Sequence, residues 1–410
     1  MNREVILQIF SGGFLGNAVP YKVIEDKLAS VLPRFPVRKV IMGWSTGKDI
    51  YEKTASFLAK SGIELYFWLP VFSETSSIRE LSPLVDFQGK PIEGGAGHSD
   101  ENFAFCCPNN PQNIERILDI YESNFSSIPF NGIFLDKIRF PSFANGFLAN
   151  ELSTGDPSAD GLLADGRAGS PGKSCVFSCF CPHCLALYEK LNIDAEKLKD
   201  ALSRQYSAPM GIKKYMGSGI YSFENETIQA FFSAKADIIT RSLEQICRYF
   251  RAKNLGIAFD VFAPFLSPFV GQNLIELSKI CDFMKPMMYR LTNAPAGLPY
   301  EVEALFRETG FRALSPVRSF SGNTTSIIPD LTSLDYTASE LHRLALSSAC
   351  PIYAGIEINR KKDIAEVYPP YIKETIRTYD RTGIHGFALS WNLLDAPEEN
   401  VAIAAKTISF

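Results

Sequence analysis

Gly132-Ile-Phe-Leu-Asp136-Lys-Ile-Arg139-Phe-Pro141 begins with a short apolar run that ends in a carboxylate. A run of this length and composition is typical of a strand buried in a parallel sheet. Seven other short runs of the same kind occur along the chain, and longer amphipathic segments lie between them. The eight expected strands are residues 5–10, 39–44, 65–69, 132–136, 256–260, 283–289, 352–357 and 387–391.

The segments between these strands have the pattern of helices, so strand and helix alternate along the chain. Asn110-Pro111 is a good helix start, with asparagine as N-cap and proline in the first turn. Eight strands with such crossovers suit a closed (β/α)8 barrel, the TIM barrel of the α/β class, better than a doubly wound sheet. Residues 1–410 are expected to form this single domain. Among the expected helices are residues 114–121, 227–249 and 370–379.

The 410 residues are 46% hydrophobic and 12% aromatic, which is ample for a sizeable core. The net charge is −4 and no run of lysine and arginine resembles a nucleic-acid footprint, so a nucleic acid is not an expected partner. No stretch approaches about 18 uninterrupted apolar residues, so no membrane span is expected. The N-terminus enters a strand at once and lacks the features of a signal peptide, which predicts a cytoplasmic protein with reduced cysteines.

Two connections between the expected strands are too long to be simple loops. One covers residues 70–108, and the other is an insertion over residues 141–226, after the fourth strand. In a barrel of this kind the loops that follow the strands lie on the catalytic face. Because the insertion has little core of its own to bury, we expect it to need an anchor.

A metal-binding anchor is predicted by Cys175-Val-Phe-Ser-Cys179-Phe-Cys181-Pro-His183-Cys184, which holds four of the nine cysteines of the chain. The Cys-x-Cys-x-x-Cys spacing within it is typical of a structural metal site. In a reducing compartment clustered cysteines indicate metal ligands rather than disulfides. We therefore expect a structural zinc ion, three of whose ligands are Cys179, Cys181 and Cys184.

We favour Cys107 as the fourth zinc ligand, with Cys106 and Cys175 as alternatives. Cys107 lies in the connection after the third strand, so a zinc ion bound there would join two loops of the catalytic face. A reduced cluster of thiols without metal is the competing interpretation.

Strand-end carboxylates are the main indication of function. In a barrel strand, alternate residues face the barrel interior and the surrounding helices. In residues 256–260 the apolar Ile257 and Phe259 form the outward set, which places Asp260 inward. The same alternation turns Asp136 and Glu357 inward. Three strands thus each end in a carboxylate at the end of the barrel that carries active sites.

Three inward acids favour a catalytic site, although strand-end acids are also common as structural ion pairs. Glycoside hydrolysis requires two carboxyl groups across the scissile bond, one of which donates a proton. Aromatic rings suit the apolar faces of sugars, and basic side chains beside the acids supply counter-charge. Lys285 is also a candidate Schiff-base lysine. The residues expected to bind the substrate are Arg139, Lys285, Tyr289, Trp391 and Trp44.

Competing chemistries mostly lack the residues that they need. The four histidines are isolated from one another, whereas a binuclear metal hydrolase in a barrel requires several as ligands. The glycine-rich motifs that bind phosphate groups are absent. No organic cofactor is expected.

Several of these motifs resemble the glycosyl-hydrolase-like barrel families of bacteria. They are Cys107-Pro-Asn-Asn-Pro111, the strand motif of residues 131–141, and Cys179-Phe-Cys181-Pro-His-Cys184. One cysteine followed by Cys-x-Cys-x-x-Cys also resembles the zinc cluster of the family 42 β-galactosidases. The segment Cys281-Asp-Phe-Met-Lys-Pro-Met-Met-Tyr289 is similar to the sixth strand of several glycosidase-like barrels. The resemblance implies glycan chemistry and a structural zinc.

The resemblance leaves the roles of the acids open. Family 42 enzymes resemble their wider clan in having an Asn-Glu pair at the end of strand four, where this chain has Leu135-Asp136. Glu357 matches the expected position of a strand-seven nucleophile. Asp136 followed by an acid on the next strand resembles amylase-like barrels instead. Asp136 is accordingly expected to be the nucleophile or base, and Asp260 or Glu357 the proton donor.

The sequence therefore predicts a glycoside hydrolase that acts on an oligosaccharide or glycoside, with Asp136, Asp260 and Glu357 as its carboxylates. A carbohydrate-binding barrel without hydrolytic activity is one alternative. An aldolase or lyase that uses Lys285 to form a Schiff base is the other.

Overall fold

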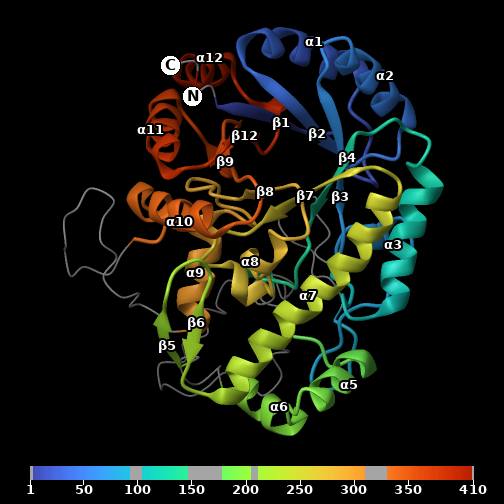
Figure 1. Cartoon of the computed structure of the whole chain (residues 1–410), viewed down its shortest axis with the longest axis vertical. Coiled ribbons are helices and arrows are strands. Elements are labelled where there is room, and N and C mark those ends of the chain that lie inside the picture. The colour runs from blue at the N-terminus through green and yellow to red at the C-terminus, as the bar shows by residue number, and fades with distance from the viewer. Residues whose placement is uncertain (1–2, 93–103, 146–177, 205–210, 310–329, 409–410) are drawn as a thin grey trace.

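The computed structural model describes residues 3–92, 104–145, 178–204, 211–309 and 330–408. Its main feature is an eight-stranded sheet of parallel strands in the order β8-β7-β4-β3-β2-β1-β12-β9 (Figure 1). The strands are β1 (Glu4–Phe10), β2 (Val37–Gly43), β3 (Glu64–Pro70), β4 (Gly132–Asp136), β7 (Gly256–Val261), β8 (Phe283–Pro286), β9 (Tyr353–Glu357) and β12 (Gly386–Ser390).

The sheet closes into a barrel where its two outer strands, β8 and β9, meet. Two isolated parallel bridges, Met284 with Ile352 and Met287 with Gly355, join these strands. The other neighbouring strands pair through longer parallel ladders, of which that between β1 and β2 has a register shift at Val5/Ile6. We call this junction the β8/β9 seam. The predicted (β/α)8 fold and all eight expected strands are confirmed, although β8 ends at Pro286, earlier than expected.

Helices surround the barrel, as Figure 1 shows. The expected N-cap is confirmed, because the Asn110 side chain accepts a hydrogen bond from the Gln112 N–H. The main helices are α1 (Tyr21–Val31), α2 (Lys48–Ala59), α3 (Pro111–Asn124), α7 (Glu226–Ala252), α8 (Leu274–Leu277), α9 (Leu298–Thr309), α10 (Leu334–Ser347), α11 (Pro369–Tyr379) and α12 (Glu398–Ile408). Short 3-10 helices are η1 (Leu32–Arg34), η2 (Thr75–Ser77), η3 (Ser267–Val270), η4 (Asp380–Thr382) and η5 (Leu393–Asp395).

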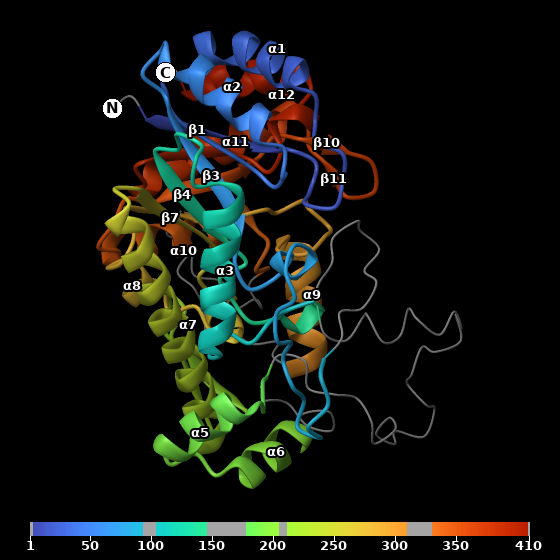
Figure 2. The ribbon, with the colours of Figure 1, turned by 90° about the vertical axis from the view of Figure 1, so that its right-hand side faces the viewer.

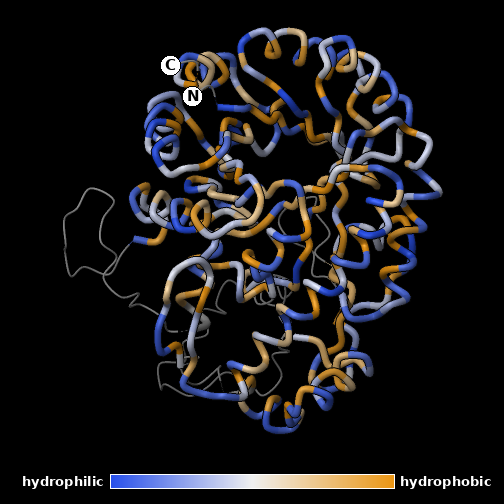
Figure 3. Tube along the Cα trace, in the orientation of Figure 1, coloured by the Kyte–Doolittle hydropathy of each residue, from blue (hydrophilic) through white to orange (hydrophobic). Residues whose placement is uncertain are grey.

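The core has two layers, and they confirm the predicted alternation along the strands. Ile257 and Phe259 belong to the large cluster between barrel and helices, whereas Ala258 belongs to a smaller cluster inside the barrel. Figure 3 shows hydrophobic residues along the barrel strands and mixed hydropathy along the outer helices. Because the alternation holds, side chains at even positions of β4 and β7 face the barrel axis.

The described part of the insertion after β4 packs at one end of the molecule. Figures 1 and 2 place its helices at the end opposite to the two chain termini. Cys175, the alternative metal ligand, lies outside the described residues. The elements of the insertion are α5 (Pro182–Lys190), α6 (Ala195–Arg204) and the hairpin of β5 (Ile212–Tyr215) and β6 (Tyr221–Phe223). A second small hairpin joins β10 (Arg360–Lys361) and β11 (Ala365–Glu366).

Among the described helices, none is both long and apolar enough to cross a membrane.

Candidate active site

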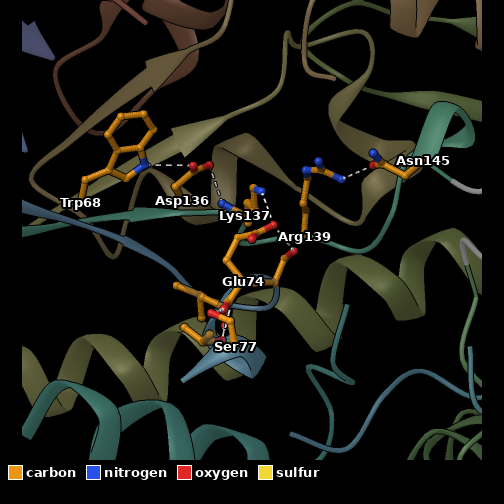
Figure 4. Close-up of polar contacts among 10 residues, drawn as sticks. Trp68, Glu74, Ser77, Asp136, Lys137, Arg139 and Asn145 are labelled. Carbon is orange, nitrogen blue, oxygen red and sulfur yellow. Dashed lines mark hydrogen bonds and ion pairs between the residues drawn. The ribbon is translucent and has the colours of Figure 1, made fainter. Parts of the chain in front are cut away.

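Asp136 is the last residue of β4 and is buried, with 7% of its surface exposed. Its Oδ2 accepts a hydrogen bond of 2.9 Å from the indole Nε1 of Trp68, on the neighbouring strand β3. Its Oδ1 accepts one of 2.5 Å from the backbone N–H of Lys137 (Figure 4). Both carboxylate oxygens are therefore oriented by N–H donors, one from β3 and one from the residue that follows β4.

A buried ion pair lies directly beside Asp136. Lys137 Nζ contacts Glu74 Oε1, in the loop after β3, at 2.9 Å (Figure 4). Both residues have a positive φ, 49° for Lys137 and 62° for Glu74, which non-glycine residues adopt rarely and mostly where the surroundings fix them. The Lys137 ammonium also lies 4.6 Å from the centre of the Trp44 ring. The pair thus joins the residue that follows Asp136 to the loop after β3.

Sequence reasoning missed Glu74. The loop after β3 stays paired to the end of β4, because the N–H of Val71 donates to the Asp136 carbonyl and that of Phe72 to the Lys137 carbonyl. This pairing brings Glu74 next to Lys137. The only sequence signal for Glu74 is an acid in a long connection on the catalytic face, which is too weak to single it out.

Arg139 is buried and directed away from Asp136, along the chain that follows β4. Its Nη1 donates to Asn145 Oδ1 at 2.9 Å (Figure 4) and to the Phe140 carbonyl. Its guanidinium also lies over the rings of Phe262 and Phe105, at 4.5 and 5.0 Å from their centres. These contacts make Arg139 an organiser of the loop after β4.

Asp260, on β7, forms a buried ion pair with Lys285, which is its register partner on β8. Asp260 Oδ2 and Lys285 Nζ lie 2.8 Å apart. Lys285 Nζ also donates to Gln8 Oε1 at 2.8 Å and to the Tyr289 hydroxyl at 2.7 Å, so each of its three protons has an acceptor. Burial lowers the pKa of Lys285, but the Asp260 charge and Tyr289 outweigh it and raise the pKa above its ordinary value. The lysine is held protonated, which disfavours a Schiff-base role.

The Oδ1 atom of Asp260 lies outside this ion pair. Within the described part of the chain, nothing hydrogen-bonds to Asp260 Oδ1, although the residue is only 2% exposed. Burial raises the pKa of Asp260 to about 7; the Lys285 charge opposes this shift, and the charge of Asp136 adds to it. Asp260 therefore has one anchored oxygen, one free oxygen and a pKa suited to proton transfer near neutral pH.

Asp136 and Asp260 lie on neighbouring strands and at the same level of the barrel. The β4–β7 register pairs Leu135 with Phe259, and the two acids are the next residues of their strands. Neighbouring strands are about 4.8 Å apart, and both acids face the barrel interior. The structure therefore brings these two predicted carboxylates together.

Glu357, at the end of β9, has a different environment. Its Oε1 accepts hydrogen bonds from the N–H groups of Leu291 and Thr292 and from the Thr292 hydroxyl, at 3.0, 2.6 and 2.7 Å. Its Oε2 accepts from the Arg290 N–H at 3.0 Å and from the Tyr371 hydroxyl. Burial raises the pKa of Glu357, and the hydrogen bonds from Tyr371 and Thr292 oppose that shift. Four donors from the loop that follows β8 and the Tyr371 hydroxyl of α11 thus occupy Glu357, which holds that loop.

Several N–H donors near the strand ends lack partners among the described residues. Gln8 Oε1 accepts from both Lys285 and the Ser390 hydroxyl, which fixes the amide and leaves its Nε2 without a partner. The indole Nε1 atoms of Trp44 and Trp391 are likewise unpaired. A buried polar group left unpaired costs about 1–3 kcal/mol, so such groups usually meet water or a ligand.

The predicted aromatic residues differ in their accessibility. Trp44 is 4% exposed and packs edge-on against Trp68, with the ring centres 5.4 Å apart. Tyr289 is also buried, and burial raises its pKa to about 12. Trp391 is half-buried, with Lys361 Nζ 5.8 Å from its ring centre. The peptide bonds before Trp44 and Trp391 are both cis. Of these three rings, Trp391 offers the most surface to a ligand.

Four buried cysteines, from the connections that follow β3 and β4, form a cluster. Their sulfur atoms all lie within 4.8 Å of one another, and Cys107 Sγ is 3.5 Å from Cys181 Sγ and 3.6 Å from Cys184 Sγ. Sulfurs at the corners of a tetrahedron about 2.3 Å from zinc would be about 3.8 Å apart. The donor set and its spacing therefore fit a four-coordinate zinc ion. The cluster consists of Cys107, Cys179, Cys181 and Cys184.

Cys107 is the residue that completes this set, as favoured from the sequence. It joins the connection after β3 to the insertion, where the Asn109 side chain also donates to the His183 carbonyl. Cys106 is buried but is not part of the cluster, and burial raises its pKa to about 12. His183 is exposed, so the four thiols alone form the candidate metal site.

No family model and no curated protein matches the sequence. Among solved structures, the fold is similar to the PgaB (BpsB) glycoside hydrolase domain from Bordetella bronchiseptica, with a TM-score of 0.56, 10% identity, and coverage of 100% of this chain and 99% of that one. Two further similar structures are α-L-fucosidase isoenzyme 2 from Paenibacillus thiaminolyticus (TM-score 0.47, 10% identity, 100% and 49% covered) and a class V chitinase from Pseudomonas fluorescens (0.45, 10%, 99% and 99%). At 10% identity, the similarity to the Bordetella domain shows a shared fold.

Proposed function

We propose that this protein is a glycoside hydrolase whose two catalytic carboxyl groups are Asp136 and Asp260. The observation that carries the proposal is their placement on neighbouring strands, at one level, in two different environments. Hydrolysis of a glycosidic bond needs one carboxyl group that donates a proton and one that stays ionised. Catalytic sites of this kind typically contain two carboxyl groups whose surroundings give them different pKa values, so that one donates a proton and the other stays ionised.

Asp260 is the proton donor in this proposal. Its pKa of about 7 keeps a large fraction protonated near neutral pH, and its free Oδ1 is the atom that would deliver the proton to the glycosidic oxygen. Lys285 fixes the other oxygen and so orients the group. Asp136, held by two N–H donors, acts as the nucleophile or as the base that activates water.

Glu357 has a positioning role in this proposal, because both of its oxygens are occupied by the loop after β8. That loop directly follows Tyr289, the hydrogen-bond partner of Lys285. Glu357 therefore acts on the site through the loop.

A carbohydrate is the substrate class that the surroundings favour. The unpaired N–H groups of Gln8, Trp44 and Trp391 would donate to sugar oxygens, and the Trp391 ring offers an apolar face. The name of the similar Bordetella domain, a glycoside hydrolase, agrees with this choice.

A structural zinc ion is the second part of the proposal, held by Cys107, Cys179, Cys181 and Cys184 as in the family 42 resemblance. Four thiolate ligands leave no open coordination position, so the ion would fix loops and take no part in hydrolysis. Metal analysis of the purified protein should give one zinc per chain. The Cys184→Ser variant should lose it and unfold at lower temperature, whereas Cys247→Ser, at a buried cysteine outside the cluster, should keep it.

Hydrolysis of a panel of aryl glycosides and oligosaccharides tests the catalytic proposal. Wild-type protein should turn over at least one of them, and Asp136→Asn should bind that substrate without turnover. Binding without turnover by wild-type protein across the panel would instead indicate a carbohydrate-binding barrel. An active Asp136→Asn variant would refute the assignment of Asp136.

A further inference from the structure

The β8/β9 seam contains a second pair of close cysteines, far from the zinc cluster in sequence. Cys281 lies just before β8 and Cys350 just before β9. Their sulfur atoms are 3.6 Å apart, and each residue is 7% exposed. The two sulfur atoms therefore lie in contact at the β8/β9 seam, where two isolated bridges join the strands.

Neighbouring contacts hold the two segments side by side. The N–H of Ala349 donates to Ser278 Oγ at 2.9 Å, which ties the chain before β9 to the chain before β8. The Met284 N–H donates to the Pro351 carbonyl at 3.0 Å, one step further along the seam. Ser348 Oγ donates to the Cys350 carbonyl at 2.8 Å and fixes the turn. These hydrogen bonds hold the segments before β8 and β9 together, and so place the two thiols next to each other.

The pair does not form a metal site within the described residues. A metal ion held by protein alone needs a third or fourth ligand, and the cluster with Cys107 is the one group of three or more possible ligands found there. Cys247 is buried in the same region but does not complete such a group with Cys281 and Cys350. Two thiols in contact without a further ligand are the starting arrangement for a disulfide. The sulfurs would have to approach by about 1.5 Å to reach the S–S bond length of about 2.05 Å.

We propose that Cys281 and Cys350 are a redox modification site, at which a small peroxide closes a disulfide across the β8/β9 seam. The Cys350 sulfur attacks one peroxide oxygen, the O–O bond breaks, and one water leaves after protonation. The sulfenic acid formed on Cys350 is then attacked by the Cys281 sulfur, and a second water leaves. In sum, two thiols and one hydrogen peroxide give one disulfide and two waters.

Cys350 is the suitable attacking residue. Its contact with the Cys281 thiol lowers the pKa of Cys350, although burial opposes this effect. Residual exposure of 7% admits a small oxidant more readily than a bulky one. The bond would close a loop between residues 69 apart in the sequence, which restricts the unfolded chain. It would also add a covalent link between β8, which carries Lys285, and β9, which carries Glu357.

Peptide mapping of wild-type protein treated with hydrogen peroxide tests this inference without any substitution. We expect one new cross-linked peptide joining residues 281 and 350, a mass lower by two hydrogen atoms, and reversal by dithiothreitol. The oxidised protein should melt several degrees higher than the reduced protein. Zinc content measured in parallel distinguishes this event from oxidation of the other cluster.

Variants provide the matched comparison. Cys281→Ser and Cys350→Ser should lose both the cross-link and the rise in melting temperature, whereas Cys247→Ser should keep both. The proposal is overturned if the mapped disulfide joins any other pair, or if Cys281 and Cys350 remain alkylatable thiols after peroxide treatment that oxidises other cysteines.

Discussion

Asp260 and Glu357 lie at the carboxyl ends of β7 and β9, the strands on either side of β8, and both are almost fully buried. Asp260 gives one oxygen to Lys285 on β8 and leaves the other without a partner among the described residues. Glu357 gives both oxygens to the loop after β8. The same sequence signal, an acid at the inward position of a strand end, thus corresponds to two different environments. What distinguishes them is whether hydrogen-bond donors from other segments have already occupied the carboxylate.

The carboxyl end of the barrel thus has two sides, which differ in how their acids are bound. On the side of β4 and β7, Asp136 and Asp260 lie side by side on neighbouring strands, and we place the chemistry there. On the side of β9, Glu357 stabilises the backbone. If this division is right, substitutions on the two sides should fail in different ways.

Asp136→Asn should have the largest effect on the β4–β7 side. We expect turnover to fall by about 10⁴-fold, the upper end for loss of an acid–base group, because the amide can neither attack nor accept a proton. Steady-state kinetics on the substrate found in the panel measures it, with the melting temperature as a check on folding. Asp282→Asn is the matched control, since Asp282 is exposed at the opposite end of its strand and contacts Arg251. Equal losses in both variants would break the division.

Asp260→Asn should lower turnover of unactivated glycosides by about 10²–10⁴-fold. Substrates with a good leaving group, such as dinitrophenyl glycosides, need little protonation and should recover most of the lost rate. This dependence on the leaving group is the signature of a missing proton donor. An equal loss with both substrate types would assign Asp260 another role.

The pH profile of wild-type protein should show the proton on Asp260. Because burial raises its pKa to about 7, the acid is protonated below that pH and loses its proton above it. We expect kcat/KM on unactivated substrates to fall about tenfold per pH unit above about pH 7. In Asp260→Asn, or with dinitrophenyl glycosides, this limb should disappear. A limb that persists in the variant would belong to another group.

Glu357→Gln should have the smallest effect on turnover and a clear effect on stability. The amide keeps one acceptor oxygen but turns an NH2 group toward donors of the loop, with a cost of about 1.5–3 kcal/mol for each charged hydrogen bond lost. Thermal and urea unfolding measure the cost, and we expect turnover to fall far less than in Asp136→Asn. A loss as large as that of Asp136→Asn with unchanged stability would make Glu357 a catalytic residue.

Much of the fold was open to prediction because its signals are local. A parallel strand has to be apolar on both faces, so runs such as residues 132–136 stand out from the amphipathic helices. The period of two along a strand then places Asp136 and Asp260 inward. The local Cys-x-Cys-x-x-Cys spacing also predicted the thiol cluster. Cys107 could be predicted as its fourth member because the loops that follow neighbouring strands lie close together.

The rest of the candidate site depends on contacts between distant segments. Glu74 reaches Lys137 only because the loop after β3 stays paired to β4 and both residues adopt a positive φ. Four of the five donors to Glu357 come from residues 65–67 positions away in the sequence. No local pattern encodes either arrangement.

The sequence by itself determined the barrel, the inward direction of three acids and the cysteine spacing, because periodicity and residue type act over a few neighbours. The tertiary structure decided which acids remain available for chemistry. Among the described residues nothing hydrogen-bonds to Asp260 Oδ1, and the pKa of Asp260 is about 7 because burial and the charge of Asp136 raise it against the opposing charge of Lys285. The Glu357 carboxylate is occupied instead, because the folded loop after β8 supplies four donors to it and Tyr371 of α11 supplies a fifth. Availability of lone pairs is a property of packing, which depends on the whole folded chain.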